Sequence, residues 1–250
     1  MKNKTYIIGS AGGNVTAIKI LNSPRGRDYY AKFGRNLIFD NQNQKVEQAG
    51  FLILPDNHFE MSGGEFCGNA ARAVAIIISK IKNTAEPQFT MSGFKGTVFG
   101  FIKNKSAGRY LVKCSFPAMS VKVIDINLNG PVKLVDMDGI VHVVIEKDFP
   151  IEDFKKQHYQ IRQQLNLEDR DAVGVIWTSR SDLGIKIDPV VWVKEIDSFF
   201  YESSCGSGSI AVAKALNISK VIQPTGDIIT VEINGESVSL ESSMEVINED

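Results

Sequence analysis

The most constraining feature of this 250-residue chain is a nine-residue motif that occurs twice. Residues 67–75 read CGNAARAVA and residues 205–213 read CGSGSIAVA, so that Cys-Gly opens both copies and Ala-Val-Ala closes both. The order of apolar runs around the two copies also matches. An internal duplication explains this pattern, and it gives Cys67 and Cys205 equivalent places in the fold.

Apolar periodicity predicts four helices and many short strands. The helices are expected over residues 27–39, 67–82, 151–165 and 205–216. The strands are expected over residues 6–8, 15–20, 51–54, 89–91, 97–102, 110–116, 141–145, 172–177, 190–193, 199–201, 228–233 and 237–240. A last strand near residues 244–247 can pack on either half of the chain.

These elements predict an α+β fold with two pseudo-symmetric halves. Each half is expected to be a mostly antiparallel sheet or barrel wrapped around a central helix. Residues 1–120 form the half that carries Cys67, and residues 121–250 form the half that carries Cys205. A chain of this length can bury a separate core in each half.

Composition excludes several classes of function. The net charge of −1 and the lack of a basic run argue against a nucleic-acid partner or an anionic membrane. The first nine residues are too short and too polar for a signal peptide, and no apolar run reaches the length of a membrane span, so we expect a cytoplasmic protein.

The three cysteines, Cys67, Cys114 and Cys205, include no C-x-x-C pair, and the three histidines are scattered. The sequence therefore predicts neither a disulfide framework nor a metal site. Cys114 lies in a strand-like run without a glycine and has no counterpart in the repeat, so we interpret it as structural.

The two Cys-Gly sites suggest acid–base chemistry. Each cysteine opens a predicted helix, where free backbone N–H groups and the helix dipole favour a thiolate and can hold a carboxylate. We therefore expect each thiol to have a pKa below its reference value of about 8.5. The glycine after each cysteine lets a ligand approach the backbone closely.

Two halves that face each other would place these thiols on opposite sides of one cleft. An amino acid held there by its carboxylate would have its α-carbon between the sulfurs. One thiolate would remove the α-proton and the other thiol would return a proton to the opposite face. The backbone amides would stabilise the charge that develops on the carboxylate. This scheme predicts an isomerase that needs no cofactor and acts on a small-molecule amino acid.

Residues 64–70 (GEFCGNA) and 204–208 (SCGSG) resemble the paired signatures of the diaminopimelate epimerase-like superfamily of cofactor-independent racemases. The resemblance covers nearly the whole chain and implies that superfamily's fold. It also implies roles for further residues. Substrate would contact Asn14, Glu47 and Gln48 and the amides of Gly68, Asn69, Gly206 and Ser207, while His142 and Glu202 would tune the thiols.

Three departures from the epimerases indicate a different substrate. Ile140 and Gly174 stand where epimerases have asparagine, and Ser203 stands where they have arginine. A diaminopimelate bound here would lack partners for its second amino-acid head, at about 1–3 kcal/mol for each unpaired polar group. Residues 47–51, 61–70 and 202–208 more closely resemble the histidine racemases of opine-metallophore (staphylopine-type) biosynthesis, which implies histidine as the substrate.

Alternatives remain open at the level of sequence. Asn14 can also be explained as a common turn residue, and His142 as a common core residue of an apolar strand. Glu47 fits equally well as a residue at the end of a strand. Glu202 fits as an ordinary carboxylate before a helix, and its negative charge would raise the pKa of a nearby thiol. Arg72 is expected to be a solvated helix residue.

The whole protein has alternatives too. It could be a diaminopimelate epimerase, a racemase of another amino acid, a phenazine-biosynthesis-type isomerase or a non-catalytic amino-acid-binding protein. The phenazine branch lacks the cysteine pair. A homodimer is also left open.

Overall fold

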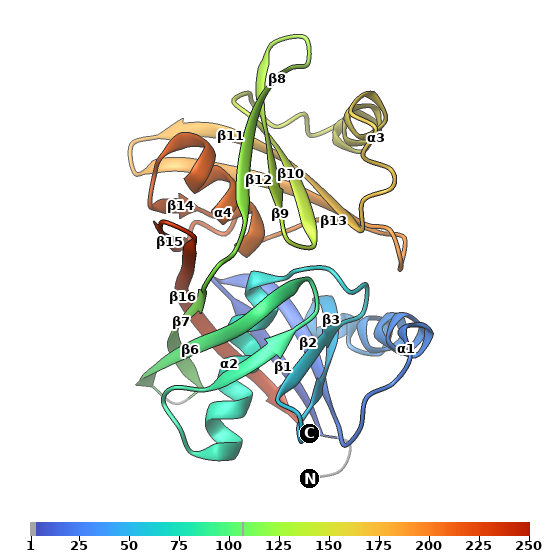
Figure 1. Ribbon diagram of the computed structural model, residues 1–250, viewed down its shortest axis with the longest axis vertical. Helices are drawn as coiled ribbons and strands as arrows, with labels where there is room; N and C mark the ends of the chain where they lie inside the picture. Colours follow the sequence, from blue (N-terminus) through green and yellow to red (C-terminus); the bar gives the residue numbers. More distant parts are fainter. Residues whose placement is uncertain (1–3, 107) are drawn as a thin grey trace.

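The computed structural model describes residues 4–106 and 108–250, which form two groups of elements (Figure 1). The first group comprises β1 (Thr5–Ser10), β2 (Gly13–Leu21), α1 (Arg27–Asp40), the 3₁₀ turn η1 (Gln42–Gln44), β3 (Val46–Ile53), β4 (His58–Met61), α2 (Gly68–Lys82), β5 (Gln88–Met91), β6 (Phe94–Ser106) and β7 (Arg109–Phe116). The second comprises β8 (Val121–Asn127), β9 (Pro131–Met137), β10 (Ile140–Ile145), α3 (Phe154–Gln164), β11 (Ala172–Ser181), β12 (Gly184–Val193), β13 (Ser198–Tyr201), α4 (Gly206–Leu216), β14 (Lys220–Ile222) and β15 (Ile228–Asn234).

The last strand, β16 (Ser237–Glu249), joins the two groups. Its first residues pair with β15, its middle with β7, and its end with β1. Because β1 to β7 pair in order along one sheet, the β1–β16 pairing closes the first group into a barrel. The segments expected at residues 237–240 and 244–247 are therefore one continuous strand, and its end packs on the first group.

The four expected helices are present, although α3 begins at Phe154 rather than at residue 151. Four strands were not expected: β4, β8, β9 and β14. Two of these, β4 and β14, have only four and three residues. Most side chains of β8 and β9 stay at least partly exposed, so these strands supply few of the buried apolar residues on which the prediction depended. Within residues 4–106 and 108–250, no helix is long and apolar enough to cross a bilayer.

Helices α2 and α4 lie in the core, whereas α1 and α3 lie on the outside. Residues 68–78 of α2 and 206–213 of α4 are all buried. A helix that is apolar around its whole circumference is stable only inside a core. The outer helices bury only a few residues each, such as Tyr30 in α1 and Ile161 in α3.

The two central helices have matching ends. Cys67 caps α2 with φ/ψ of −133°/108°, and Cys205 caps α4 with −132°/109°. At their other ends, Asn83 and Asn217 both adopt the left-handed conformation, at 52°/51° and 53°/51°. The two helices therefore begin and end with nearly the same backbone conformations, although α2 has 15 residues and α4 has 11.

The N-termini of α2 and α4 abut. A Cβ atom on Gly68 would lie 3.4 Å from the backbone of Gly206, and one on Gly206 would lie 3.1 Å from the carbonyl carbon of Gly68. Only glycine allows backbones to approach this closely. The glycine that follows each cysteine therefore brings the two Cys-Gly sites together.

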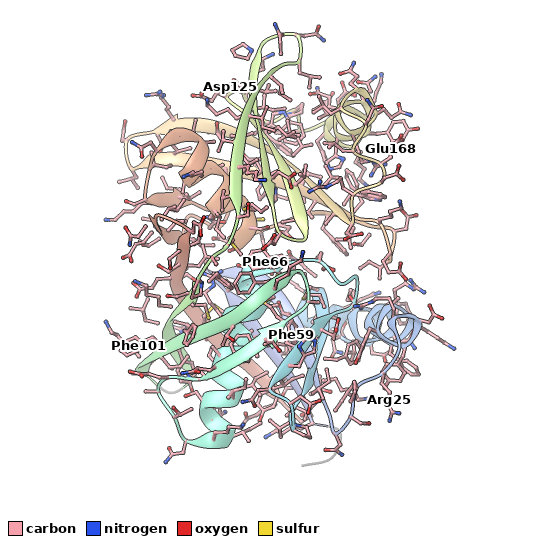
Figure 2. The ribbon with its side chains drawn as sticks, in the orientation of Figure 1. Arg25, Phe59, Phe66, Phe101, Asp125 and Glu168 are labelled. Carbon is pink, nitrogen blue, oxygen red and sulfur yellow. The ribbon has the colours of Figure 1, made fainter. Side chains whose placement is uncertain are left out.

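The loop before Cys67 is held between two glycine turns. Phe66 lies where the two groups meet (Figure 2) and packs edge-on against Phe116. A Cβ atom on Gly93 would lie 2.1 Å from the backbone nitrogen of Phe66, and one on Gly139 would lie 2.7 Å from the Cα of Gly93. Both glycines have φ near +71°, so each position requires glycine for its backbone conformation as well as for the close contact.

This packing predicts that Gly93→Ala destabilises the protein by on the order of 3 kcal/mol, from the left-handed backbone and the overlap with Phe66 together. Urea unfolding measures the loss. Gly26→Ala is the matched control, because a Cβ atom there would meet nothing within 4 Å and its φ is −74°. The control should change stability by less than about 1 kcal/mol, and equal effects of both variants would contradict the prediction.

Candidate active site

Cys67 and Cys205 are buried, unpaired cysteines at the first turns of the two central helices. The sulfur of Cys67 accepts a hydrogen bond from the backbone nitrogen of Ala70 at 3.4 Å. The sulfur of Cys205 accepts one from the backbone nitrogen of Gly208 at 3.2 Å. Each sulfur therefore faces the N–H end of its helix, as the sequence predicted.

Two side chains connect the cysteines across the junction of the two groups. The thiol of Cys67 donates to Oε1 of Gln48 at 3.1 Å, and Nε2 of Gln48 donates to Oε1 of Glu202 at 2.7 Å. The Glu202 carboxyl in turn lies close enough to Cys205 to raise the pKa of that thiol. Both sulfurs thus point to one place, which the Gln48–Glu202 pair occupies.

Asn14 and Glu47 lie beside this pair. The hydroxyl of Ser203 donates to Oε1 of Glu47 at 2.6 Å and accepts from the backbone nitrogen of Asn14 at 2.6 Å. The side-chain amide of Asn14 donates to Oε2 of Glu47 at 3.4 Å. Asn14 has φ of 40°, so it makes the turn that its residue type suggested and also places a buried amide near the cysteines.

His142 reaches Cys205 through one hydroxyl. Its Nε2 lies 3.0 Å from Oγ of Ser207, which lies 3.6 Å from the sulfur of Cys205. Burial lowers the pKa of His142 to about 3, so the ring is neutral. A Cβ atom on Gly174 would lie 2.0 Å from Nδ1 of His142. The imidazole therefore fills the space that a side chain at position 174 would need.

The expectation that Arg72 is solvated is wrong, because this residue is fully buried. Its guanidinium donates to the carbonyl of Gly68, to the hydroxyls of Ser10 and Ser242, and to Oδ1 of Asn69. Within the described part of the chain, no carboxylate lies within 4 Å of it. Burial lowers the pKa of Arg72 only to about 10, so a cation lies beneath the first turn of α2.

Asn69 carries this network across to the second cysteine. Its Oδ1 accepts from Arg72, and its Nδ2 donates to the carbonyl of Ser204 at 2.8 Å. The backbone nitrogen of Cys205 is fixed separately by Oε1 of Gln223 at 2.8 Å. These contacts hold the two helix starts in one position relative to each other.

The expected low thiol pKa values are not found. Burial raises the pKa of Cys67 to about 12, and the negative charge of Glu202 adds to the shift. The same two causes raise the pKa of Cys205 well above its ordinary value. The helix N–H groups lower both pKa values by less. In the ligand-free protein both thiols are therefore protonated.

Three carboxyls lie around the thiols, two of them buried and that of Glu47 half-buried. Burial raises the pKa of Glu202 to about 8 and that of Glu65 to about 7, and it raises the pKa of Glu47 as well. The ionisation of each opposes that of its neighbours, since the charges of Glu47 and Glu65 both raise the pKa of Glu202. Such a concentration of shifted groups is typical of an active site.

A small cavity of about 20 Å³ adjoins these groups. It is lined by Ile38, Glu47, Gln48, Ala49, Met61, Ser62, Glu65, Val191, Val193, Ile196, Ser198, Phe200 and Glu202. Among the described residues, no group of three or more His, Cys, Asp and Glu side chains is arranged to hold a metal ion.

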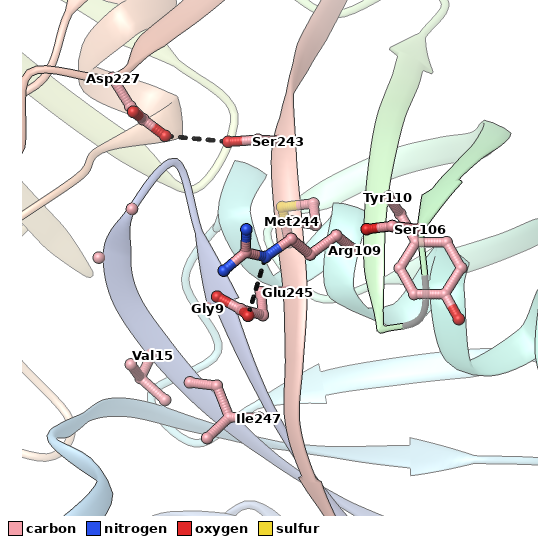
Figure 3. A pocket seen from close by; sticks show the side chains of 12 residues that line it. Gly9, Val15, Ser106, Arg109, Tyr110, Asp227, Ser243, Met244, Glu245 and Ile247 are labelled. Atoms are coloured by element: carbon pink, nitrogen blue, oxygen red, sulfur yellow. Dashed lines mark hydrogen bonds and ion pairs between the residues drawn. The ribbon is translucent and has the colours of Figure 1, made fainter.

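A larger pocket of about 490 Å³ lies along β16 and beside the Gly12–Gly13 turn (Figure 3). Its walls include the exposed Arg109–Glu245 ion pair and the hydrogen bond from Ser243 to Asp227. It contains neither cysteine and none of the buried carboxyls. The larger pocket therefore lacks the ionisable groups described above, and these groups lie around the smaller cavity instead.

Residues 11–246 match the family described as "Histidine racemase CntK N-terminal domain". The chain belongs to the histidine racemase family. A histidine racemase of Fusobacterium nucleatum subsp. nucleatum (strain ATCC 25586) is 31% identical over 85% of this chain and 83% of its own length. A second histidine racemase, from strain ATCC 23726 of the same subspecies, is 30% identical with the same coverage. The resemblance found in the sequence is thus confirmed.

Solved structures share the family's fold at low sequence identity. A "Predicted Epimerase" from Pseudomonas aeruginosa has a TM-score of 0.65 at 9% identity, with 100% of this chain and 98% of that chain covered. A phenazine biosynthesis protein of the PhzF family from Enterococcus faecalis has a TM-score of 0.59 at 16% identity, with the same coverage. At these identities the likeness concerns the fold alone.

Sequence reasoning missed four residues of the site: Arg72, Glu65, Ser203 and Gln223. A signal existed for the first, because Arg72 interrupts a helix that is otherwise apolar on every face, so it cannot reach solvent. Glu65 and Ser203 share a position, two residues before each cysteine, which the repeat could have shown. No signal in the sequence connects Gln223 to the backbone of Cys205.

The shifted carboxyls predict how stability depends on pH. Since the folded pKa of Glu202 is about 8 and its ordinary value is 4.5, its stabilising contribution is complete below about pH 4.5 and is lost as pH rises through 8. Glu202→Gln should unfold with nearly wild-type free energy at pH 5. At pH 9 it should be more stable than wild type by roughly 2–4 kcal/mol.

Urea unfolding at pH 5, 7 and 9 measures this difference. The exposed Glu236→Gln, in the turn before β16, is the control and should show a difference that does not change with pH. A Glu202→Gln variant that becomes less stable than wild type as pH rises would contradict the raised pKa.

Proposed function

We propose that this chain interconverts L- and D-histidine by moving the α-proton between Cys67 and Cys205. Membership in the histidine racemase family supports the reaction and the substrate. One observation supports the assignment of the two cysteines: Cys67 donates to Gln48, Gln48 donates to Glu202, and Glu202 lies close enough to Cys205 to raise the pKa of its thiol. A substrate that replaces these contacts would meet a thiol on each side.

The substrate carboxylate binds at the two helix starts. The N–H groups of the first helical turn have no partners inside their own helix, and here the first turns of α2 and α4 meet. Gly68 and Asn69 supply them from one side, and Gly206 and Ser207 from the other. Both helix dipoles and the buried cation of Arg72 favour the added negative charge.

The proton moves in two balanced steps. The thiolate of one cysteine takes the α-proton, so an S–H bond forms and the electron pair of the Cα–H bond delocalises into the carboxylate. The helix amides stabilise this charge. The opposite thiol then gives its proton to the other face of Cα and becomes the thiolate, which leaves the inverted amino acid and a cysteine pair ready for the reverse reaction.

Glu202 makes the first thiolate. This carboxyl lies beside the thiol of Cys205, and a carboxylate with a pKa near 8 accepts a proton more readily than an ordinary one. The ammonium group of a bound amino acid offsets the negative charge of Glu47 and Glu202, which lowers the thiol pKa values from their ligand-free levels. His142 holds Ser207 in position beside Cys205.

The matching helix ends support an internal duplication, with one half at residues 1–120 and the other at 121–250. Cys67 and Cys205 have the same backbone conformation to within about one degree, and the residues that end their helices agree as closely. Strand β16 crosses from the second half to close the barrel of the first. The duplication gives two equivalent bases facing each other, which is what inversion at one carbon needs.

Other substrates of the superfamily fit less well. His142 fills the space above Gly174, Ile140 is buried and apolar, and Ser203 is bound to Glu47. None of these three positions can hold the second amino-acid head of diaminopimelate. The phenazine-type alternative is supported by fold alone, whereas the curated relatives over most of the chain are histidine racemases.

Replacing either cysteine tests the assignment. Purified Cys67→Ser and Cys205→Ser should racemise L-histidine at least about 10²-fold more slowly than wild type, because each removes one positioned proton carrier. In D₂O, proton NMR reports loss of the α-hydrogen signal and chiral chromatography reports D-histidine.

Cys114→Ala is the control: Cys114 is a buried cysteine of β7 with no described hydrogen bond to Gln48 or Glu202, so its loss should leave the rate within about threefold of wild type. If wild type formed no D-histidine under reducing conditions, the function would be wrong. If either serine variant kept more than a tenth of the wild-type rate, the two-base assignment would fail instead.

A further inference from the structure

The cavity beside the cysteines lies where the side chain of a bound amino acid would extend. Gln48 and Glu202 form part of its wall and are the same residues that bridge the two thiols. Its volume of about 20 Å³ is roughly the space of one water molecule, so it has to widen to accept a ring. Its remaining walls are mostly apolar, with Val193 and Phe200 among them.

Glu65 is a buried carboxyl in this cavity, with 6% of its surface exposed. Among the described residues no side chain donates to its Oε2, and only the backbone near Gly63 and Glu65 lowers the pKa of this carboxyl by hydrogen bonding. A buried oxygen without a donor costs about 1–3 kcal/mol. The nearest cation, Arg27, does not satisfy it, because the guanidinium donates to the Glu60 carboxylate and to the carbonyls of Met61 and Ser62.

The other carboxyls of the cavity are already engaged. Glu47 accepts from Ser203 and Asn14, while Glu202 accepts from Gln48. The charge of Glu65 still affects the centre of the site, since it raises the pKa of both Cys67 and Glu202. Glu65 is therefore near the reacting groups without taking part in their hydrogen bonds.

The backbone is adapted to the position of this carboxyl. A Cβ atom on Gly63 would lie 2.5 Å from Oε2 of Glu65 and 2.3 Å from Cγ1 of Val193. The carboxyl therefore lies against the bare backbone of Gly63, next to an apolar wall. A side chain at position 63 would move Glu65 without removing it.

We propose that Glu65 binds an N–H group of the substrate's imidazole ring and makes the enzyme selective for histidine. This inference rests on the proposed function. The ring would enter the widened cavity with its faces against apolar side chains and one nitrogen against Oε2. An imidazole N–H supplies the missing donor, and the ring's cationic form would pair with the carboxylate. A site built around a substrate N–H rejects analogues that lack it far more strongly than an apolar pocket can.

The test compares histidine with β-(2-thienyl)alanine, which has a five-membered ring without an N–H group. Glu65→Met should lower kcat/KM for L-histidine by at least about 100-fold, mostly through KM. The same variant should change kcat/KM for thienylalanine by less than about threefold. Glu65→Gln should give an intermediate loss for histidine, because its amide keeps one hydrogen bond but no charge. Gly63→Ala should likewise lower the preference for histidine.

Titration calorimetry with both amino acids measures affinity independently of turnover. The Kd of Glu65→Met for histidine should rise at least about 100-fold, with the Kd for thienylalanine unchanged within about threefold. The exposed Glu236→Gln should change neither.

Each unfavourable outcome has a distinct meaning. An equal loss for both amino acids would show that Glu65 only supports the loop before Cys67, and it would overturn the proposal. Wild-type protein that bound thienylalanine as tightly as histidine would also overturn it. Wild-type protein that racemised no histidine at all would instead refute the proposed function.

Discussion

The contact between the first turns of α2 and α4 determines where everything else in the site lies. Gly68 and Gly206 are in contact: a methyl group on Gly206 would press on the backbone of Gly68 and Asn69, and one on Gly68 would overlap Leu240. This contact brings two helix dipoles and two sets of free N–H groups together, and each cysteine caps the helix beside it. Both thiols and the carboxylate site follow from one glycine pair, so the chemistry depends on backbone packing before it depends on any side chain.

That arrangement gathers several ionisable groups where little water reaches them, so the charge of each group affects the pKa values of the others. Two thiols, the carboxyls of Glu65 and Glu202 and one guanidinium are buried within a few side chains of each other, and the half-buried Glu47 lies beside them. Without substrate, burial raises the pKa values of these acids and keeps both thiols protonated, while Arg72 keeps its charge among neutral acceptors. An amino acid brings one ammonium and one carboxylate into this environment. We therefore expect a thiolate to form only when substrate is bound and lowers the thiol pKa values.

Local patterns in the sequence predicted the four helices and the equivalence of the two Cys-Gly sites, because helical periodicity and a repeated motif are carried by neighbouring residues. The contacts that define the environment of the thiols are not local. Gln48 meets Glu202 across 154 residues, and Cys205 is held by Gln223 on the chain segment leading to β15. The thiol pKa was mispredicted for the same reason. The helix field was visible in the sequence, but the burial that outweighs it depends on the packing of both groups of elements.

The proposed function also indicates where specificity would have to come from. Two equivalent bases would serve a substrate with one side chain, which needs a pocket on one side only, so the surroundings of the two cysteines have to differ. They differ two residues before each one, where Ser203 is bound to Glu47 and Glu65 faces the cavity. Closing one side and leaving an unpaired acceptor on the other turns a symmetric proton-transfer site into an asymmetric binding site. The identity of the substrate can therefore change through this position while the catalytic pair stays the same.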